Sequence, residues 1–147
     1  MTIADYERVY ALWLATPGMG LNNLDDSYDG IAKYLARNPN TCFVAEAEPE
    51  CEGEKEIVGV ILCGHDGRRG YIHHTAVAAG EQRRGIGAAL VSAAMAALKR
   101  EGINKAALVV FGGNMKGNAF WEKQGFIIRH DLNYRNKAIA ELTRIDT

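Results

Sequence analysis

The sequence lacks the features that mark several classes of protein. No uninterrupted apolar run reaches the length needed to span a membrane, and no basic and then apolar leader stands at the N-terminus. Internal repeats and low-complexity segments are also missing. We therefore expect a soluble protein of the cytoplasm that has no membrane partner.

Cysteine is scarce, with only Cys42, Cys51 and Cys63 in the chain. An odd number without metal-type spacing predicts neither a disulfide framework nor a metal site. Cys42 and Cys63 fall in apolar, strand-like runs, where a thiol packs as a small hydrophobic group. This usage fits a reducing compartment.

An excess of charge is missing too, since 17 Lys and Arg against 18 Asp and Glu leave a formal net charge of -1. The chain as a whole therefore does not attract nucleic acid, and only a local basic patch such as Arg83-Arg84 would hold a polyanion. Nucleic acid is not an expected partner. The length of 147 residues predicts one domain, residues 1–147, that buries a working core.

Alternating helical and strand patterns predict a mixed α/β fold. The expected helices begin at Thr2–Asp5 and continue until Pro17-Gly18, run from about Ser27 to Arg37, follow Gly85 to Arg100, and run from Asn114 to Gln124. The expected strands are 42–45, 57–63, 70–77, 105–111, 126–130 and 134–142. Residues 17–24 are expected to form a loop, and the acidic run 46–56 a solvated hairpin loop.

The most informative run is residues 75–90, where an apolar strand leads through a short basic loop into a helix that opens with Gly85 and Gly87. The first amides of a helix lack internal acceptors, and the helix dipole places positive charge there. Glycine also allows an anion to approach the backbone closely. The run predicts a site for a phosphorylated small molecule, although a glycine turn with solvated arginines would give the same pattern.

Residues 82–87, Gln-Arg-Arg-Gly-Ile-Gly, resemble the Gln/Arg-x-x-Gly-x-Gly/Ala signature of the GCN5-related N-acetyltransferase (GNAT) family. A second segment of that family follows in order, with Asn114 and then residues 118–126, Asn-Ala-Phe-Trp-Glu-Lys-Gln-Gly-Phe. The resemblance covers roughly residues 42–142. It implies the acyl-CoA N-acyltransferase fold, a mixed central sheet flanked by helices.

The resemblance implies acetyl-CoA as the co-substrate and no metal. The backbone of Thr75, Ala76 and Val77 would pair with the pantetheine arm. Asn114 and Asn118 resemble positions that touch the pantetheine and phosphate portion, and a helix cap is the alternative role for Asn114. The residues implied in gripping the pyrophosphate are Gln82, Arg83, Arg84, Gly85, Ile86, Gly87 and Ala88.

The activity that the resemblance implies is direct transfer of an acetyl group, within a ternary complex, to the primary amine of a small molecule or peptide. The amide near Thr75 would stabilise charge on the thioester oxygen. His73 is the expected proton acceptor, as at a similar place in aralkylamine acetyltransferases, and a packing role is its alternative. Tyr71 shares its face and would orient acceptor or water, whereas His74 is expected on the opposite face of the strand.

Trp121 departs from the family pattern, which commonly has a tyrosine that protonates the leaving thiolate. An indole is no practical proton source, so Trp121 either walls the cleft or packs in the core, and water or Tyr134 would have to act as acid. A catalytically impaired CoA-binding regulatory module is therefore the alternative function. A dinucleotide-dependent oxidoreductase is disfavoured, because the third glycine of that fingerprint is missing.

The N-terminal part also departs from the family, whose members begin with a strand before the first helix. That strand is either absent here or omitted by the start of the sequence, and a homodimer is one way to cover the edge left open. Acceptor choice is expected in residues 17–26 and the first two helices. Asp25 and Asp26 belong to that region, and helix capping is their alternative role.

Overall fold

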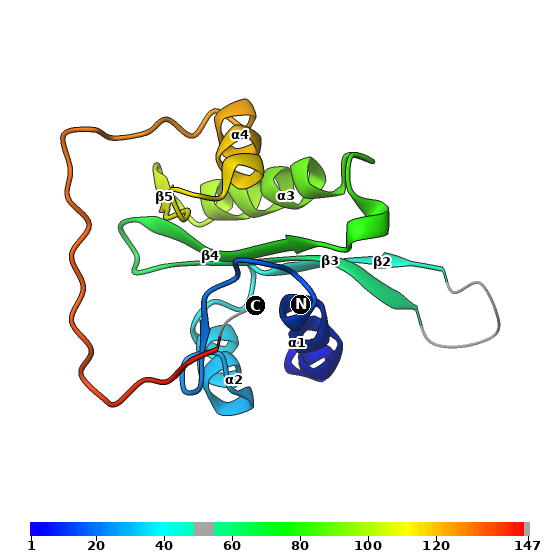
Figure 1. Cartoon of the computed structure of the whole chain (residues 1–147). Helices are drawn as coiled ribbons and strands as arrows, with labels where there is room; N and C mark the ends of the chain where they lie inside the picture. Colours follow the sequence, from blue (N-terminus) through cyan, green and yellow to red (C-terminus); the bar gives the residue numbers. More distant parts are fainter. Residues whose placement is uncertain (49–54, 146–147) are drawn as a thin grey trace.

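The computed structural model describes residues 1–48 and 55–145, so that Cys51 and most of the expected acidic loop lie outside it. A four-stranded mixed sheet in the order β2-β3-β4-β5 has helices on both faces (Figure 1). The strands β2 (Phe43–Ala47), β3 (Glu56–His65) and β4 (Gly70–Val77) are antiparallel, and β5 (Ala106–Leu108) runs parallel to β4. The expected α/β fold is confirmed, although β5 is shorter than its apolar run.

One face of the sheet is covered by the N-terminal helices, a 3₁₀ turn η1 (Ile3–Asp5), α1 (Tyr6–Leu14) and α2 (Tyr28–Arg37). The Ser27 hydroxyl caps α2 by accepting from Gly30 N–H at 3.1 Å, which explains where this helix begins. The core on this face contains Val9, Trp13, Ile31, Leu35, Val60 and Leu62. Both helices were predicted from their apolar spacing.

The opposite face is covered by α3 (Ile86–Arg100) and α4 (Met115–Lys123). Its core contains Ile61, Cys63, Ile72, Leu90, Ala94 and Leu98. A Cβ at Gly59 of β3 would lie 2.9 Å from Ile86 and 3.1 Å from Leu90, so α3 approaches the sheet more closely than any other residue would allow. The start of α3 is thereby fixed against β3.

The two closing strands expected over 126–130 and 134–142 do not form. Residues 126–143 instead run as an extended arc outside the body and return to it (Figure 1). The final strand β6 (Arg144–Ile145) pairs antiparallel with β1 (Leu21–Asn22), which lies in the expected loop 17–24. The C-terminal segment therefore gains backbone partners from β1 and not from β5.

A β-bulge in β4 changes which way its side chains point. Leu62 of β3 pairs with His74, whereas Cys63 pairs with Ile72, so His73 is an extra residue without a partner in this ladder. A bulge of this kind breaks the strict alternation of a strand. The expectation that His73 and His74 face opposite sides is therefore wrong.

The outer edge of β2 is open among the described residues, since its partner in the sheet is β3 alone. This is the edge at which the resembling family has its first strand. The Met1 amino group donates to Cys42 O at 3.0 Å, just before β2 begins. Most of the β2 edge remains without that cover.

Candidate active site

The strands β4 and β5 separate partway along their length. Their parallel ladder joins Gly70 to Ala106, Tyr71 to Ala107 and Ile72 to Leu108, and there it ends among the described residues. Strand β4 continues to Val77. The side of β4 that faces β5 is therefore unpaired from the bulge at His73 onward, where Thr75, Ala76 and Val77 lie.

Strand β4 leads directly into the loop that precedes α3. After the 3₁₀ turn η2 (Ala79–Glu81), Arg83 has φ 65° and Gly85 has φ 86°. A Cβ at Gly85 would meet nothing within 4 Å, so glycine is needed there for the left-handed backbone rather than for space. The helical ladder begins with Ala89 N–H donating to Gly85 O at 3.0 Å, so the amides of 86–88 precede it.

Gly87 lies where α3 packs against α4. A Cβ at Gly87 would lie 3.2 Å from two atoms of the Phe120 ring and 3.7 Å from Val77 Cγ2. The position therefore faces α4 and allows it to pack closely on α3. The expectation that Gly87 also clears the path of an anion stays a prediction.

The polar side chains of the loop already have partners within the protein. Gln82 Nε2 donates to Val77 O at 3.2 Å, which ties the loop to the end of β4. Arg84 pairs with Glu81, while the exposed Arg83 side chain makes no hydrogen bond or ion pair with residues 1–48 or 55–145. Among these three, Arg83 is thus the readiest to meet an anion, and Arg84 would first have to leave Glu81.

Asn114 and Asn118 both serve the structure of α4. Asn114 Oδ1 caps the helix by accepting from Gly117 N–H at 2.8 Å, as the alternative reading anticipated. Asn118 Nδ2 donates to Phe111 O at 3.0 Å and to Asn114 O at 2.8 Å. These bonds fix the segment that enters α4.

Trp121 packs into the core on the α3 face. Its ring centroid lies 5.0 Å from that of Phe120 and 5.2 Å from that of Phe126, both at steep angles. Of the two roles considered for this residue, the structure supports packing.

His73 lies on the α2 side of the sheet among aromatic rings. Its ring centroid is 4.7 Å from that of Tyr71 and 5.3 Å from that of Tyr34 in α2. His73 keeps an exposed surface, but partial desolvation by the protein around it and the neighbouring His74 lower its pKa below 6.5. Partial burial raises the pKa of Tyr71 above 10. His73 is therefore neutral near pH 7 and able to accept a proton.

His74 lies on the same side and is held by an acidic residue that the sequence pattern did not single out for this contact. Its Nε2 is 2.7 Å from Asp26 Oδ1, and its ring centroid is 5.0 Å from that of Trp13 in α1. Asp26 is one of few buried charged residues, at 4% exposed. An acidic side chain expected to cap α2 thus reaches β4, while Ser27 caps the helix.

Thr75 has a buried hydroxyl that finds no hydrogen-bond partner among the described residues. Leaving a buried hydroxyl unpaired costs about 1–3 kcal/mol, and Trp13 Nε1 and the Tyr34 hydroxyl are unpaired in the same way among the described residues. Thr75 stands on the unpaired stretch of β4. A polar group that enters the gap between β4 and β5 would meet the strand at this residue.

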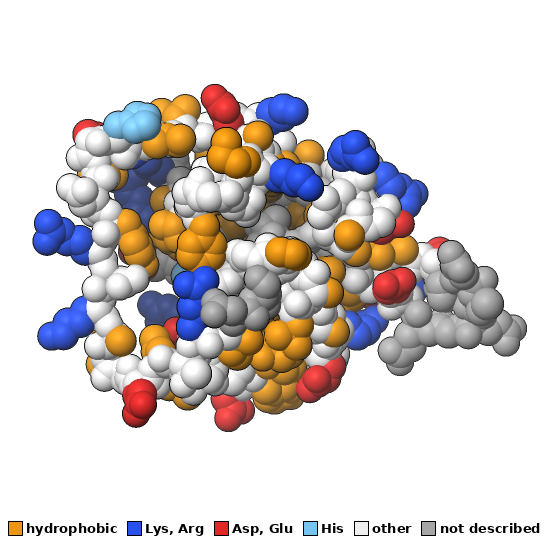
Figure 2. Space-filling view, in the orientation of Figure 1, with side chains coloured by type: hydrophobic (Ala, Val, Ile, Leu, Met, Phe, Trp, Pro, Cys, Tyr) orange, Lys and Arg blue, Asp and Glu red, His pale blue; other side chains and the backbone are white. Residues whose placement is uncertain are grey.

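Residues from three distant segments meet at Phe111, which follows β5. A Cβ at Gly20 would lie 2.8 Å from the Phe111 ring, and the Arg144 guanidinium carbon is 5.3 Å from the centre of that ring. Between the 126–143 arc and the body, Figure 2 shows an opening with hydrophobic side chains at its border. Large apolar residues exposed along or before the arc include Val109, Phe111, Ile127, Ile128, Leu132, Tyr134, Ile139 and Leu142.

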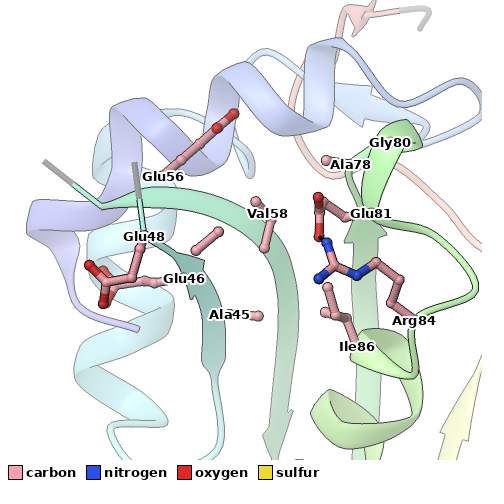
Figure 3. Close-up of a pocket in the computed structure, with 11 residues that line it drawn as sticks. Ala45, Glu46, Glu48, Glu56, Val58, Ala78, Gly80, Glu81, Arg84 and Ile86 are labelled. Atoms are coloured by element: carbon pink, nitrogen blue, oxygen red, sulfur yellow. Dashed lines mark hydrogen bonds and ion pairs between the residues drawn. The ribbon is translucent and has the colours of Figure 1, made fainter. Parts of the chain in front are cut away.

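A hollow of about 730 Å³ lies between the strands β2 and β3 and the loop that leads from β4 to α3 (Figure 3). It is lined by residues of β2, β3 and the loop, among them Glu46, Glu48, Glu56, Glu81 and Arg84. Four carboxylates against one arginine, which already pairs with Glu81, make this hollow unfavourable for an anion. It borders the open edge of β2.

Residues 1–48 and 55–145 contain no group of three or more His, Cys, Asp or Glu side chains arranged to hold a metal ion. Over the same ranges, no helix has the length and apolar character needed to cross a bilayer.

Comparison with known proteins agrees with the geometry. The sequence matches the acetyltransferase (GNAT) family over residues 6–126. Acetyltransferase plu1384 of Photorhabdus laumondii is 32% identical over 130 residues, which cover 86% of this chain and 82% of the relative. Acetyltransferase SG1711 of Sodalis glossinidius is 29% identical over 137 residues, covering 93% and 91%.

A solved structure supports the same fold. The PaiA N-acetyltransferase of Thermoplasma acidophilum, crystallised in complex with coenzyme A, superimposes with a TM-score of 0.70 at 17% identity and covers 88% of this chain and 87% of its own. The match over most of the chain, together with the separated strands and the loop before α3, leads to one assignment: the chain belongs to the acetyltransferase (GNAT) family.

Proposed function

We propose that this protein transfers an acetyl group from acetyl-CoA to the primary amine of a small molecule or peptide, by direct attack within a ternary complex. One observation carries the proposal: β4 loses its β5 partner after Ile72 and ends in the loop that opens α3. The free side of β4 can therefore pair with an extended chain, and the loop at the end of β4 can bind an anion. A thioester of a diphosphate carrier has both parts.

The residues present fit this co-substrate. The amides of Ile86, Gly87 and Ala88 precede the first helical hydrogen bond, and Gln82, Arg83, Arg84 and Gly85 surround them. Ala76 and Val77 lie on the open stretch of β4, where the Val77 carbonyl would exchange its bond from Gln82 Nε2 for one from the pantetheine arm, and the unpaired Thr75 hydroxyl supplies a further polar contact. Asn114 and Asn118 contribute by fixing the start of α4 beside the loop.

Proton transfer from the attacking amine is assigned to His73, with Tyr71 orienting the acceptor or a water molecule. A base that is neutral near pH 7 can take this proton, and the lowered pKa of His73 keeps it neutral. As the amine attacks, charge develops on the thioester oxygen, and the backbone amide near Thr75 stabilises it. Holding both reactants together supplies much of the remaining acceleration.

A catalytically impaired CoA-binding regulatory module is the second candidate, and one observation favours it. Trp121 packs with Phe120 and Phe126, so the tyrosine that commonly protonates the leaving thiolate has no substitute at this position. Water or the exposed Tyr134 would then supply the proton in an active enzyme. Tight CoA binding without acetyl transfer would decide for the regulatory module.

The decisive experiment measures free thiol released from acetyl-CoA with a panel of small amines and peptide N-termini. We expect amine-dependent release that is strongly reduced in His73→Ala, while calorimetry shows CoA binding retained in that variant. A folded protein that binds CoA but releases no thiol with any amine would contradict the enzyme assignment. Absence of CoA binding would contradict both candidates.

We also propose that the protein works in the cytoplasm as a homodimer. The free thiols of Cys42 and Cys63 fit a reducing compartment, and the open edge of β2 is a surface that native sheets normally cover. Sedimentation at several concentrations tests the assembly, and a strictly monomeric protein would contradict it.

A further inference from the structure

Asp26 stands apart from the other buried polar residues of the described chain. Asp5 pairs with Arg8, Asn38 accepts from His65 N–H, and the Thr41 hydroxyl donates to Cys63 O, all of which are contacts that serve the fold. Asp26 instead directs one carboxylate oxygen at His74, on the strand proposed to hold the acetyl donor. The side chains are 5% and 12% exposed.

Both the side chain and the backbone of Asp26 are held by hydrogen bonds. Its Oδ2 accepts from Asn22 N–H at 2.7 Å, and its backbone carbonyl accepts from the Tyr6 hydroxyl at 3.0 Å. Asn22 belongs to β1, which β6 pairs with. The carboxylate therefore reaches His74 from a fixed position, without the entropy cost of ordering a mobile side chain at each turnover.

The hydrogen bond determines the protonation pattern of His74. An ionised carboxylate accepts hydrogen bonds only, so His74 Nε2, 2.7 Å from Oδ1, must carry a proton. In the neutral ring, Nδ1 is then the unprotonated nitrogen.

The bulge places this pair beside the proposed base. Because His73 is the extra residue in β4, its ring and that of His74 lie on the same side of the sheet, against Tyr34 and Trp13 respectively. Besides Tyr71 and Tyr34, the titratable groups that act on His73 are His74, Asp26 and Asp25. Partial desolvation and His74 lower the pKa of His73, whereas Asp26 and, more weakly, Asp25 raise it.

We propose that Asp26 is a positioning residue of the acetyl-transfer site: it acts through His74, fixing which ring nitrogen carries the proton and holding one negative charge beside His73. The proposal rests on the proposed function, since it concerns the base of that reaction. Partial desolvation and the neighbouring imidazole lower the pKa of His73, whereas the Asp26 carboxylate raises it. Asp26 keeps the proposed base from becoming too weak to accept a proton.

Asp26→Asn tests the proposal because it keeps the shape and changes the bonding. The amide oxygen of asparagine is needed by Asn22 N–H, which leaves the amide nitrogen facing His74 Nε2. Nε2 must then accept, and the proton moves to Nδ1. Asp25→Asn is the matched control, because it removes a charge one residue away. The Asp25 carboxylate accepts from Asn22 Nδ2 at 3.1 Å and not from His74.

NMR of ¹⁵N-labelled protein reads both effects without turnover. In the wild type we expect a protonated Nε2 on His74. In Asp26→Asn we expect a protonated Nδ1 and a His73 titration moved downward by up to about one pH unit, with a smaller shift in Asp25→Asn. A wild-type His74 protonated on Nδ1 alone would overturn the proposal even if Asp26→Asn fails to fold. So would an unmoved His73 titration in folded Asp26→Asn.

Kinetics then connect the pair to the reaction. In Asp26→Asn we expect the acid limb of the kcat/KM profile to move to lower pH together with the His73 titration, with a reduced plateau. An acid limb that stays in place while His73 shifts would overturn the link to catalysis. If the NMR results hold and the wild type transfers no acetyl group to any amine, the proposed function fails and the Asp26–His74 coupling stands.

Discussion

Gly87 of α3 lies directly against Phe120 of α4, and a Cβ at Gly87 would be 3.2 Å from two carbons of the ring. This contact gives the second glycine of the phosphate loop a packing role. Two explanations of the residue can therefore be separated by experiment: a side chain there either blocks the anion directly or pushes α4 away.

Gly87→Val should destabilise the protein, because extra carbons in a packed contact typically cost about 1–3 kcal/mol. Denaturant unfolding and CoA calorimetry measure the two consequences. Phe120→Ala removes a packed ring and destabilises the protein by itself, so the test is a double-mutant cycle. Gly87→Val should cost less stability and less CoA affinity in the Phe120→Ala background than in the wild type, because the ring it meets is gone. If Gly87→Val no longer costs stability in that background and still abolishes CoA binding, direct obstruction of the anion is the correct explanation.

Gly85→Ala should lose stability for a different reason. The residue has φ 86° and open space around its Cβ position, so the cost is backbone strain of about 1–2 kcal/mol. Unfolding in urea measures it. Gly113→Ala is a suitable control, because its Cβ also meets nothing and its backbone does not have a positive φ. Equal losses in both variants would show that the left-handed turn is not the cause.

Gly85 and Gly87 were recognised from the sequence, because the signals that mark the start of a helix are local. The beginnings of α2 at Ser27 and of α3 after Gly85 depend on residues within one turn of the helix. Strand β4 was predicted over its observed residues for the same reason, since its apolar run leads directly into the loop.

The features that the sequence did not reveal depend on contacts between distant segments. The bulge at His73 is a property of the register between β3 and β4, and the Asp26–His74 hydrogen bond joins residues 48 positions apart. Likewise, the apolar residues of 126–142 have strand character, but which edge the segment pairs with depends on β1 and β5.

The lowered pKa of His73 predicts how both activity and stability respond to acid. Activity should fall as pH drops through a value below 6.5, because the protonated ring cannot accept the amine proton. Between that value and 6.5 the unfolded chain binds more protons than the folded one, so this residue's contribution to stability is lost as pH falls below 6.5. His73→Gln should therefore unfold with a smaller dependence on pH from 7 to 5. An unchanged dependence would contradict the assigned pKa direction.

Phe111 connects the loop at Gly20 with Arg144, so it should affect the acceptor more than the co-substrate. Phe111→Ala removes the ring on which both segments rest, and we expect the KM for the amine to rise by about tenfold, equivalent to roughly 1.4 kcal/mol. CoA affinity by calorimetry should stay nearly the same. Val109→Ala is the matched control, because that side chain lies two residues earlier and is similarly exposed, at 54% against 49%. Since Phe111 O also accepts from Asn118 Nδ2 through the backbone, the substitution leaves the entry to α4 intact. A loss of CoA affinity equal to the rise in KM would place Phe111 on the donor side of the gap and contradict its assignment to the acceptor side.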